Sequence, residues 1–138
     1  MYLLDTNVVS ELRLATSGRA NQGLLQWVER EPLDCLFLSS ISILELEVGV
    51  LRVERRDTKQ GTTLRGWLDQ QVKPAFAQRI LGFDNAAAVY CAQMHVPDPK
   101  AERDSYIAAI ATAHKLPVVT RNTADFESMG VTLINPWQ

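Results

Sequence analysis

Four acidic residues stand at positions in this sequence from which their carboxylates could act together. Asp5 follows the apolar run Met1–Leu4, Glu45 and Asp104 each lie near the start of a helical stretch, and Asp125 follows a later apolar run. Because clustered carboxylates repel one another, either some of them take up a proton or a cation binds between them. Carboxylate oxygens are the ligands that Mg²⁺ and Mn²⁺ prefer. The four acids therefore predict a metal site that could activate water for hydrolysis.

Each acid also has an ordinary structural explanation. Asp5 and Asp125 could cap the helix or turn that follows them, since aspartate is a favoured helix cap. Glu45 fits a capping box with Ser42, and for Glu45 taken alone this explanation is the better one. Asp104 could satisfy the positive end of its helix, although its spacing places it on a face of apolar residues. Taken jointly, the four positions favour a shared site.

Other chemistries find less support in the sequence. The two cysteines and two histidines lack the spacing of a zinc site. We expect Cys35 and Cys91, which have apolar neighbours, to be buried free thiols. Neither His95 nor His114 has an evident serine partner, which argues against a Ser-His-Asp hydrolase, and there is no glycine-rich phosphate loop.

The elements that must position the four acids alternate between apolar strands and helices. Because parallel strands end at one edge of a sheet, Asp5 and Thr120–Asn122 should lie together there. Gly49, one turn after Glu45, leaves open space beside that carboxylate. The pattern indicates an α/β domain with a mostly parallel sheet. We expect strands over 1–4, 35–39, 80–83, 116–120 and 131–134, and helices over 8–14, 23–31, 42–56 (with Leu44, Val48 and Leu51 along one face), 57–78 (kinked or broken at Pro74), 84–94 and 103–114.

Length and composition predict a single domain over residues 1–138. The chain is 46% hydrophobic and 22% charged, with a formal net charge of −2, which is typical of globular proteins. No apolar run approaches the roughly 20 residues that span a bilayer. The amino terminus has no basic segment before its first acid, so we do not expect a secretory signal. These features lead us to expect a cytoplasmic protein that does not enter a membrane.

The middle of the chain is basic. Residues 52–79 hold seven lysine or arginine residues and three acids. Such a stretch could contact a phosphate backbone, although charge alone favours a solvated helical face. The residues that we single out as possible phosphate contacts are Arg52, Arg55, Arg56 and Lys59.

An ordered set of short motifs resembles the PIN-domain ribonucleases, specifically the VapC-like toxins of bacterial type II toxin–antitoxin pairs. The resemblance covers essentially the whole chain. Each fragment is weak alone, and their order and separations make the set specific. The fragments are Leu3–Glu11, Leu38–Leu46 followed by Gly49, Asp104–Ala109, Leu116–Asn122, Asp125-Phe126 and Asn135-Pro136-Trp137.

The resemblance implies a three-layer α/β/α fold and an endoribonuclease that uses Mg²⁺ or Mn²⁺. It implies Asp5, Glu45 and Asp104 as the acidic core, with Asp125 as a frequent fourth member. It also implies a homodimer, a cognate antitoxin whose arginine-bearing tail fills the acidic crevice, and promoter DNA binding only through that antitoxin. Hydrogen bonds that orient the acids would come from Thr6, Asn7, Thr120 and Asn122.

Two alternative functions stay open at this point. A fold of this type could have lost catalysis and serve as a binding or regulatory subunit, although the presence of all four acids argues against loss. An acid-pocket phosphatase also places an aspartate after its first strand, but Thr6-Asn7 and Lys115 fit that class badly. Arg103, directly before Asp104, could pair with the acids or contact phosphate.

Overall fold

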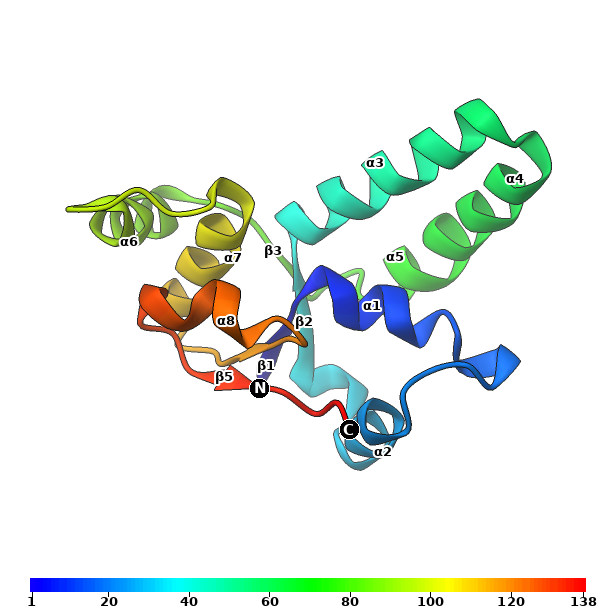
Figure 1. Cartoon of the computed structure of the whole chain (residues 1–138), viewed down its shortest axis with the longest axis horizontal. Coiled ribbons are helices and arrows are strands. Elements are labelled where there is room, and N and C mark those ends of the chain that lie inside the picture. The colour runs from blue at the N-terminus through cyan, green and yellow to red at the C-terminus, as the bar shows by residue number, and fades with distance from the viewer.

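A computed structural model describes all 138 residues, and its centre is a five-stranded sheet (Figure 1). All neighbouring strands are parallel. Apolar residues fill the central strands, as expected for a parallel sheet covered on both faces. The strands are β1 (Tyr2–Leu4), β2 (Leu36–Ser39), β3 (Ile80–Leu81), β4 (Val118–Val119) and β5 (Leu133–Ile134).

The strand order β3-β2-β1-β4-β5 creates a switch point beside the first strand. The chain steps outward from β1 to β2 and β3, then returns to place β4 on the other side of β1. Leu4 of β1 is in register with Val119 of β4, so Asp5 and Thr120 follow neighbouring strands at the same edge. Ligands of open α/β sheets bind at such a point, outside the carboxyl ends of the strands.

Helices cover both faces of the sheet, which confirms the three-layer α/β/α fold. Leu4 and Val119 belong to a core cluster on the side of α1–α5, whereas Leu3 and Val118 belong to a second cluster on the side of α6–α8. One layer comprises α1 (Thr6–Leu12), α2 (Gln22–Arg30), α3 (Ser40–Arg56), α4 (Thr58–Trp67) and α5 (Lys73–Ala75). The other comprises α6 (Asn85–His95), α7 (Glu102–Ala113) and α8 (Thr123–Phe126), and short 3₁₀ turns span Ala15–Ser17, Leu33–Cys35 and Glu127–Met129.

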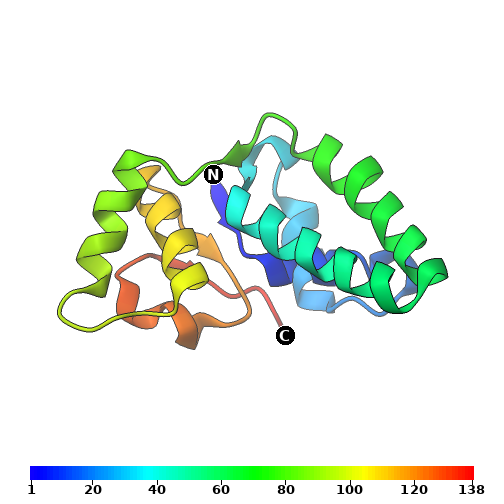
Figure 2. The ribbon, with the colours of Figure 1, turned by 90° about the horizontal axis from the view of Figure 1, so that it is seen from above.

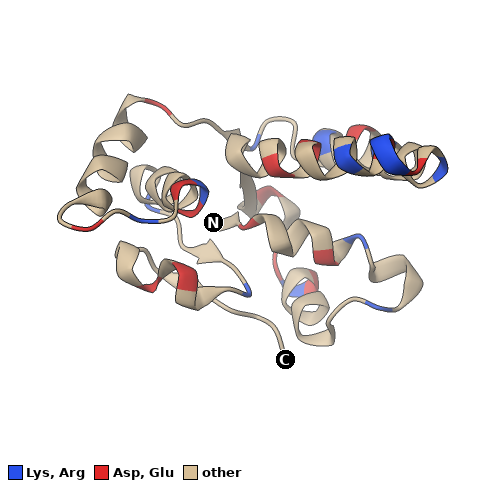
Figure 3. Cartoon of the chain, turned by 45° about the horizontal axis from the view of Figure 1, so that its top comes forward, with Lys and Arg blue, Asp and Glu red and all other residues tan.

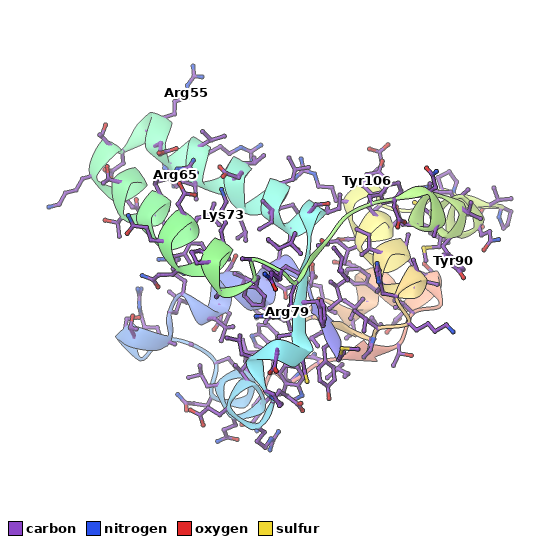
Figure 4. All side chains as sticks on the ribbon, turned by 180° about the vertical axis from the view of Figure 1, so that it is seen from behind. Arg55, Arg65, Lys73, Arg79, Tyr90 and Tyr106 are labelled. Atoms are coloured by element: carbon purple, nitrogen blue, oxygen red, sulfur yellow. The ribbon has the colours of Figure 1, made fainter.

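Helices α3 and α4 form a long hairpin that extends away from the sheet (Figure 2). Ion pairs join the two helices, because Glu47 of α3 contacts both Arg65 (2.8 Å) and Lys73 (2.6 Å). Figure 4 shows Arg65 of α4 and Lys73 of α5 on the side that faces α3. Arg65 also contacts Glu54, and both cations contact Asp69. This network holds the hairpin closed.

The helix expected over 57–78 is divided into three parts. After α4 the chain takes a π-helical turn over Leu68–Val72 before α5. The reason is Pro74, which has no N–H to donate and whose ring crowds the carbonyl one turn earlier.

Two predictions about burial were wrong, and one short helix was missed. The buried face of α3 carries Leu46, Val50 and Val53, whereas Leu44 and Leu51 are 47% and 56% exposed. Both faces of α3 carry apolar residues, so their periodicity could not indicate which face packs against α1 and α4. Cys91 is buried as predicted, but the exposure of Cys35 is intermediate. The short helix α8 was not predicted.

No helix is both long and apolar enough to span a membrane.

Candidate functional site

A polar cavity of about 510 Å³ lies at the switch point of the sheet. Three of the four predicted acids line it, and only one of its nine lining residues is apolar. In Figure 3, lysine and arginine gather on the α3–α4 hairpin, interleaved with acidic residues, while other acidic segments lie nearer the sheet. The lining residues are Asp5, Thr6, Asn7, Ser10, Glu11, Leu14, Glu45, Asp104 and Asn122.

Asp5 is held by hydrogen bonds from three sides. It is the N-cap of α1, and its Oδ1 accepts a bond from the backbone N–H of Thr6 (2.8 Å). Its Oδ2 accepts from the hydroxyl of Thr120 (2.8 Å) and from the side-chain amide of Asn7 (3.3 Å). The cap expected for Asp5 is therefore present, and the same carboxylate also faces the cavity. Because Asp5 is only 6% exposed, these donors keep it in one orientation.

Glu45 is bound by the first residue of α1 and not by its own helix. The hydroxyl of Thr6 donates to Glu45 Oε1 (2.7 Å) and lies 2.8 Å from Ser42 Oγ. The capping box predicted for Glu45 and Ser42 was wrong, because α3 starts earlier than expected. Ser39 is the N-cap and accepts from the N–H of Ser42 (3.0 Å), which leaves Glu45 too far into the helix to cap it. Glu45 is free to face the cavity.

Asp104 and Asp125 complete the acidic group. Asp104 lies in the first turn of α7, and the inward face predicted for it is confirmed by the full burial of Ile107, Ala108 and Ala111. Asp125 lies in the first turn of α8, is exposed, and does not line the cavity. It does not act as the cap of α8, whose N-cap position is held by Asn122.

The acids raise one another's proton affinity. Burial first, and then the charges of Asp5, Asp125 and Glu45, raise the pKa of Asp104 to about 6. Burial also raises the pKa of Asp5, against the hydrogen bonds from Thr120 and Thr6, which lower it. All four carboxylates therefore lie close enough to interact electrostatically. The guanidinium of Arg103, which is half-exposed, lies 3.9 Å from Glu45 Oε2 and offsets part of this charge.

The donor chemistry of the cavity suits a hard divalent cation. Its ligands would be carboxylate oxygens, and the neighbouring carboxylates, after burial, contribute to the raised pKa of Asp104, a repulsion that a cation would relieve. No three histidine, cysteine, aspartate or glutamate side chains are close enough as they stand to hold one ion. Binding would therefore require Asp5, Glu45 and Asp104 to come closer together.

The other residues singled out from the sequence lie either at the cavity or at the far end of the α3–α4 hairpin. Asn7 and Thr120 contact Asp5, Thr6 contacts Glu45, and Asn122 lines the cavity while its N–H bonds to Thr120 Oγ1 (3.0 Å). The basic residues singled out from charge are all exposed at the far end of the α3–α4 hairpin, where Arg55 points outward (Figure 4). They are Arg52, Arg55, Arg56 and Lys59.

The sequence did not indicate a partly buried hydrogen bond that joins the end of α6 to the first turn of α7. His95 has a serine partner after all, since its Nε2 lies 2.9 Å from Ser105 Oγ, and Ser105 donates in turn to the carbonyl of Glu102 (2.6 Å). The backbone N–H of Lys100 donates to His95 Nδ1, which places the imidazole proton on Nε2. Ser105 is fully buried and does not line the cavity, so this pair fixes the helix that carries Asp104 and is not a nucleophile with its base. Nothing in the spacing of these residues indicated their contact.

Comparisons with known proteins agree over the full length of the chain. The model of the PIN domain family matches residues 2–131. VapC ribonuclease Y4jK of Sinorhizobium fredii is 37% identical, with 100% of this chain and 99% of that protein aligned. Toxin FitB of Neisseria gonorrhoeae is 38% identical over 99% of each chain. A chain in the structure of FitAB bound to an IR36 DNA fragment superposes with a TM-score of 0.88 at 34% identity, covering 100% of this chain and 96% of that one.

Proposed function

This chain belongs to the PIN-domain family, and on that premise we propose that it is a metal-dependent endoribonuclease, the toxin of a type II toxin–antitoxin pair. The observation that carries the proposal is the meeting of Asp5, Glu45 and Asp104 in one polar cavity at the switch point. The names of its relatives, a VapC ribonuclease and a toxin, support it. The nuclease would consist of a single domain over residues 1–138.

In this proposal the acids of the cavity hold Mg²⁺ or Mn²⁺. Asp5, Glu45 and Asp104 would be its ligands, with Asp125 completing the site from the rim. When bound, such an ion supplies the charge that makes a water more acidic and offsets the charge growing on the phosphoryl oxygens. Thr120 and Asn7 would keep Asp5 aimed into the cavity. Either Glu45 or Asp125 would take the proton of the attacking water.

The acidity of the cavity also favours a regulatory partner. A cationic side chain from a cognate antitoxin would neutralise Asp5, Glu45 and Asp104 and occupy the space that RNA needs. The solved structure of FitAB bound to a DNA fragment supports an assembly of this kind, and we include in the proposal that this chain meets promoter DNA only through its antitoxin. We include in the proposal a homodimer and a cytoplasmic location, since RNA and the partner would both be met there.

The experiment is an RNA cleavage assay on the chain purified free of partners, with Mg²⁺, Mn²⁺ or EDTA. We expect cleavage that requires the metal and falls at least about 100-fold in an Asp5→Asn, Asp104→Asn double variant. A second double variant, Asp34→Asn with Asp98→Asn, removes two exposed acids outside the cavity and should retain activity. Circular dichroism checks that each variant is folded. A wild-type chain that binds metal and cleaves no RNA would instead be a catalytically silent binding or regulatory subunit.

A further inference from the structure

A second hollow, of about 230 Å³, lies beside the acidic cavity. The two spaces share three lining residues, Thr6, Ser10 and Glu45. The acidic cavity and the second hollow therefore adjoin along these three residues. The volume exceeds the roughly 150 Å³ of an engineered protein cavity that holds benzene, so one aromatic ring system fits.

The walls of this hollow differ in character from those of the acidic cavity. Leu46 and Val50 form a buried apolar floor, and Leu64 and Trp67 of α4 pack against the core with their remaining surface toward the space. Gly49 leaves the space open, because a Cβ placed there would meet no atom within 4 Å. The hollow thus offers an apolar, partly aromatic surface next to the carboxylates.

A positively charged side chain also lines this hollow. Arg13 lines it and also lines a further hollow of about 350 Å³, to which Arg19 contributes. Both arginines are exposed and make no ion pair. The hollow therefore has a carboxylate, an apolar and aromatic surface and a positive charge in its wall.

We propose that the hollow binds the base of the nucleotide next to the scissile phosphodiester, against Trp67, with the following phosphate near Arg13. The inference rests on the proposed ribonuclease function. An enzyme that cuts within an RNA chain must lead the adjoining nucleotides out of its acidic site. Bases stack on aromatic side chains regardless of sequence, and phosphates bind arginine. A peptide side chain could occupy an apolar hollow, but the position of this hollow beside the acidic cavity and the arginine that lines it favour RNA.

The test uses Gly49→Leu, which fills the hollow without cutting away any side chain. Leucine is a better helix former than glycine, so α3 should become more stable, and loss of function would not reflect unfolding. Gly49→Ala adds a single methyl group and should have a smaller effect. Gly82→Leu is the matched control, since it makes the same change at an exposed position with no atom within 4 Å of the new Cβ.

Binding is measured in the Asp5→Asn, Asp104→Asn background, so that the result does not depend on cleavage. The probe is a short random-sequence single-stranded RNA carrying 2-aminopurine, whose fluorescence falls when it stacks on an aromatic ring. We expect Gly49→Leu to raise the Kd about tenfold and to abolish the quenching, as loss of one base–aromatic stack would. In the active chain it should raise KM by a similar factor with little change in kcat.

Equal affinity and quenching in Gly49→Leu and Gly82→Leu would overturn the inference while leaving the ribonuclease proposal intact. Normal RNA binding by Gly49→Leu together with weakened binding of a protein partner would assign the hollow to that partner and also overturn it. If the wild-type chain neither binds nor cleaves RNA, the proposed function itself fails, and the inference fails with it.

Discussion

Thr120 donates a 2.8 Å hydrogen bond to Asp5 Oδ2, although the two residues lie 115 positions apart in the chain. The bond joins the ends of β1 and β4, the two strands on either side of the switch point. It lowers the pKa of Asp5 in a setting where burial raises it. Thr120 Oγ1 also accepts bonds from the N–H of Asn122 and the amide of Asn7. One hydroxyl therefore organises this side of the cavity.

Replacing Thr120 with valine should weaken the site while keeping its shape. The change removes a hydrogen bond to a buried carboxylate, so the free energy of unfolding should fall by about 1–3 kcal/mol. The pKa of Asp5 should rise, and metal affinity or RNA cleavage should fall about 10- to 100-fold. Thr120→Ser, which keeps the hydroxyl, should stay near wild type. Chemical denaturation and Mg²⁺ titration give the values, and a valine variant that matched the serine variant would contradict the role of this bond.

The raised pKa of Asp104 makes the metal-free protein sensitive to pH. Between the ordinary value of 3.8 and about 6, the folded protein holds a proton that the unfolded chain has released. The free energy of unfolding should therefore fall as pH rises through this window. Carboxyl ¹³C NMR in EDTA should show Asp104 titrating near pH 6, and Asp5→Asn should lower that pKa because it removes a nearby charge. A titration unchanged by Asp5→Asn would mean that the two carboxylates do not interact.

Glu47 should contribute measurably to the stability of the α3–α4 hairpin. Arg65 and Lys73 both donate to it, and these bonds hold its pKa below the ordinary value of 4.5. Glu47→Gln should lower the free energy of unfolding by about 1 kcal/mol at low salt and by less at high salt. The stabilisation is present above pH 4.5 and should disappear on acidification below it. Glu29→Gln, at an exposed position on α2, is the control, and equal effects of the two changes would rule out a network contribution.

The basic tip of the hairpin should contribute to RNA affinity through its positive charge. Changing Arg52, Arg55, Arg56 and Lys59 to glutamate should weaken RNA binding. For single-stranded RNA, the slope of log affinity against log salt should become shallower by about 0.7 for each phosphate that is no longer neutralised. Arg30→Glu on α2, which lies away from the hairpin in Figure 1, tests for a general effect of charge. Unchanged affinity at low salt would show that this surface is simply solvated.

The sequence allowed prediction of the sheet edge because that edge depends on short-range patterns. An apolar run that ends in Asp5 and another that ends in Thr120 define two buried strands, and parallel strands must end together. The inward face of α7 was equally predictable, since alanine at helical spacing from Asp104 allows close packing. In both cases a local sequence pattern was compatible with only one arrangement of the chain.

Interactions between distant side chains could not be predicted in this way. The capping box of Ser42 and Glu45 is a valid local pattern, but Ser39 caps the helix and Thr6 of another element binds Glu45. The link between His95 and Ser105 depends on how α6 packs against α7. The hollow beside Gly49 was expected as open space, but its aromatic wall comes from Trp67, which only the folded hairpin brings there.

Because Asp5 depends on Thr120, the order in which a ribosome makes the chain determines when the acidic cavity exists. Synthesis delivers Asp5 and Glu45 early, Asp104 late and Thr120 after it. A growing polypeptide therefore has β1 without its β4 neighbour, and an aspartate without its threonine donor. For an enzyme proposed to cut RNA, we therefore expect the complete site to form only after β4 has been made.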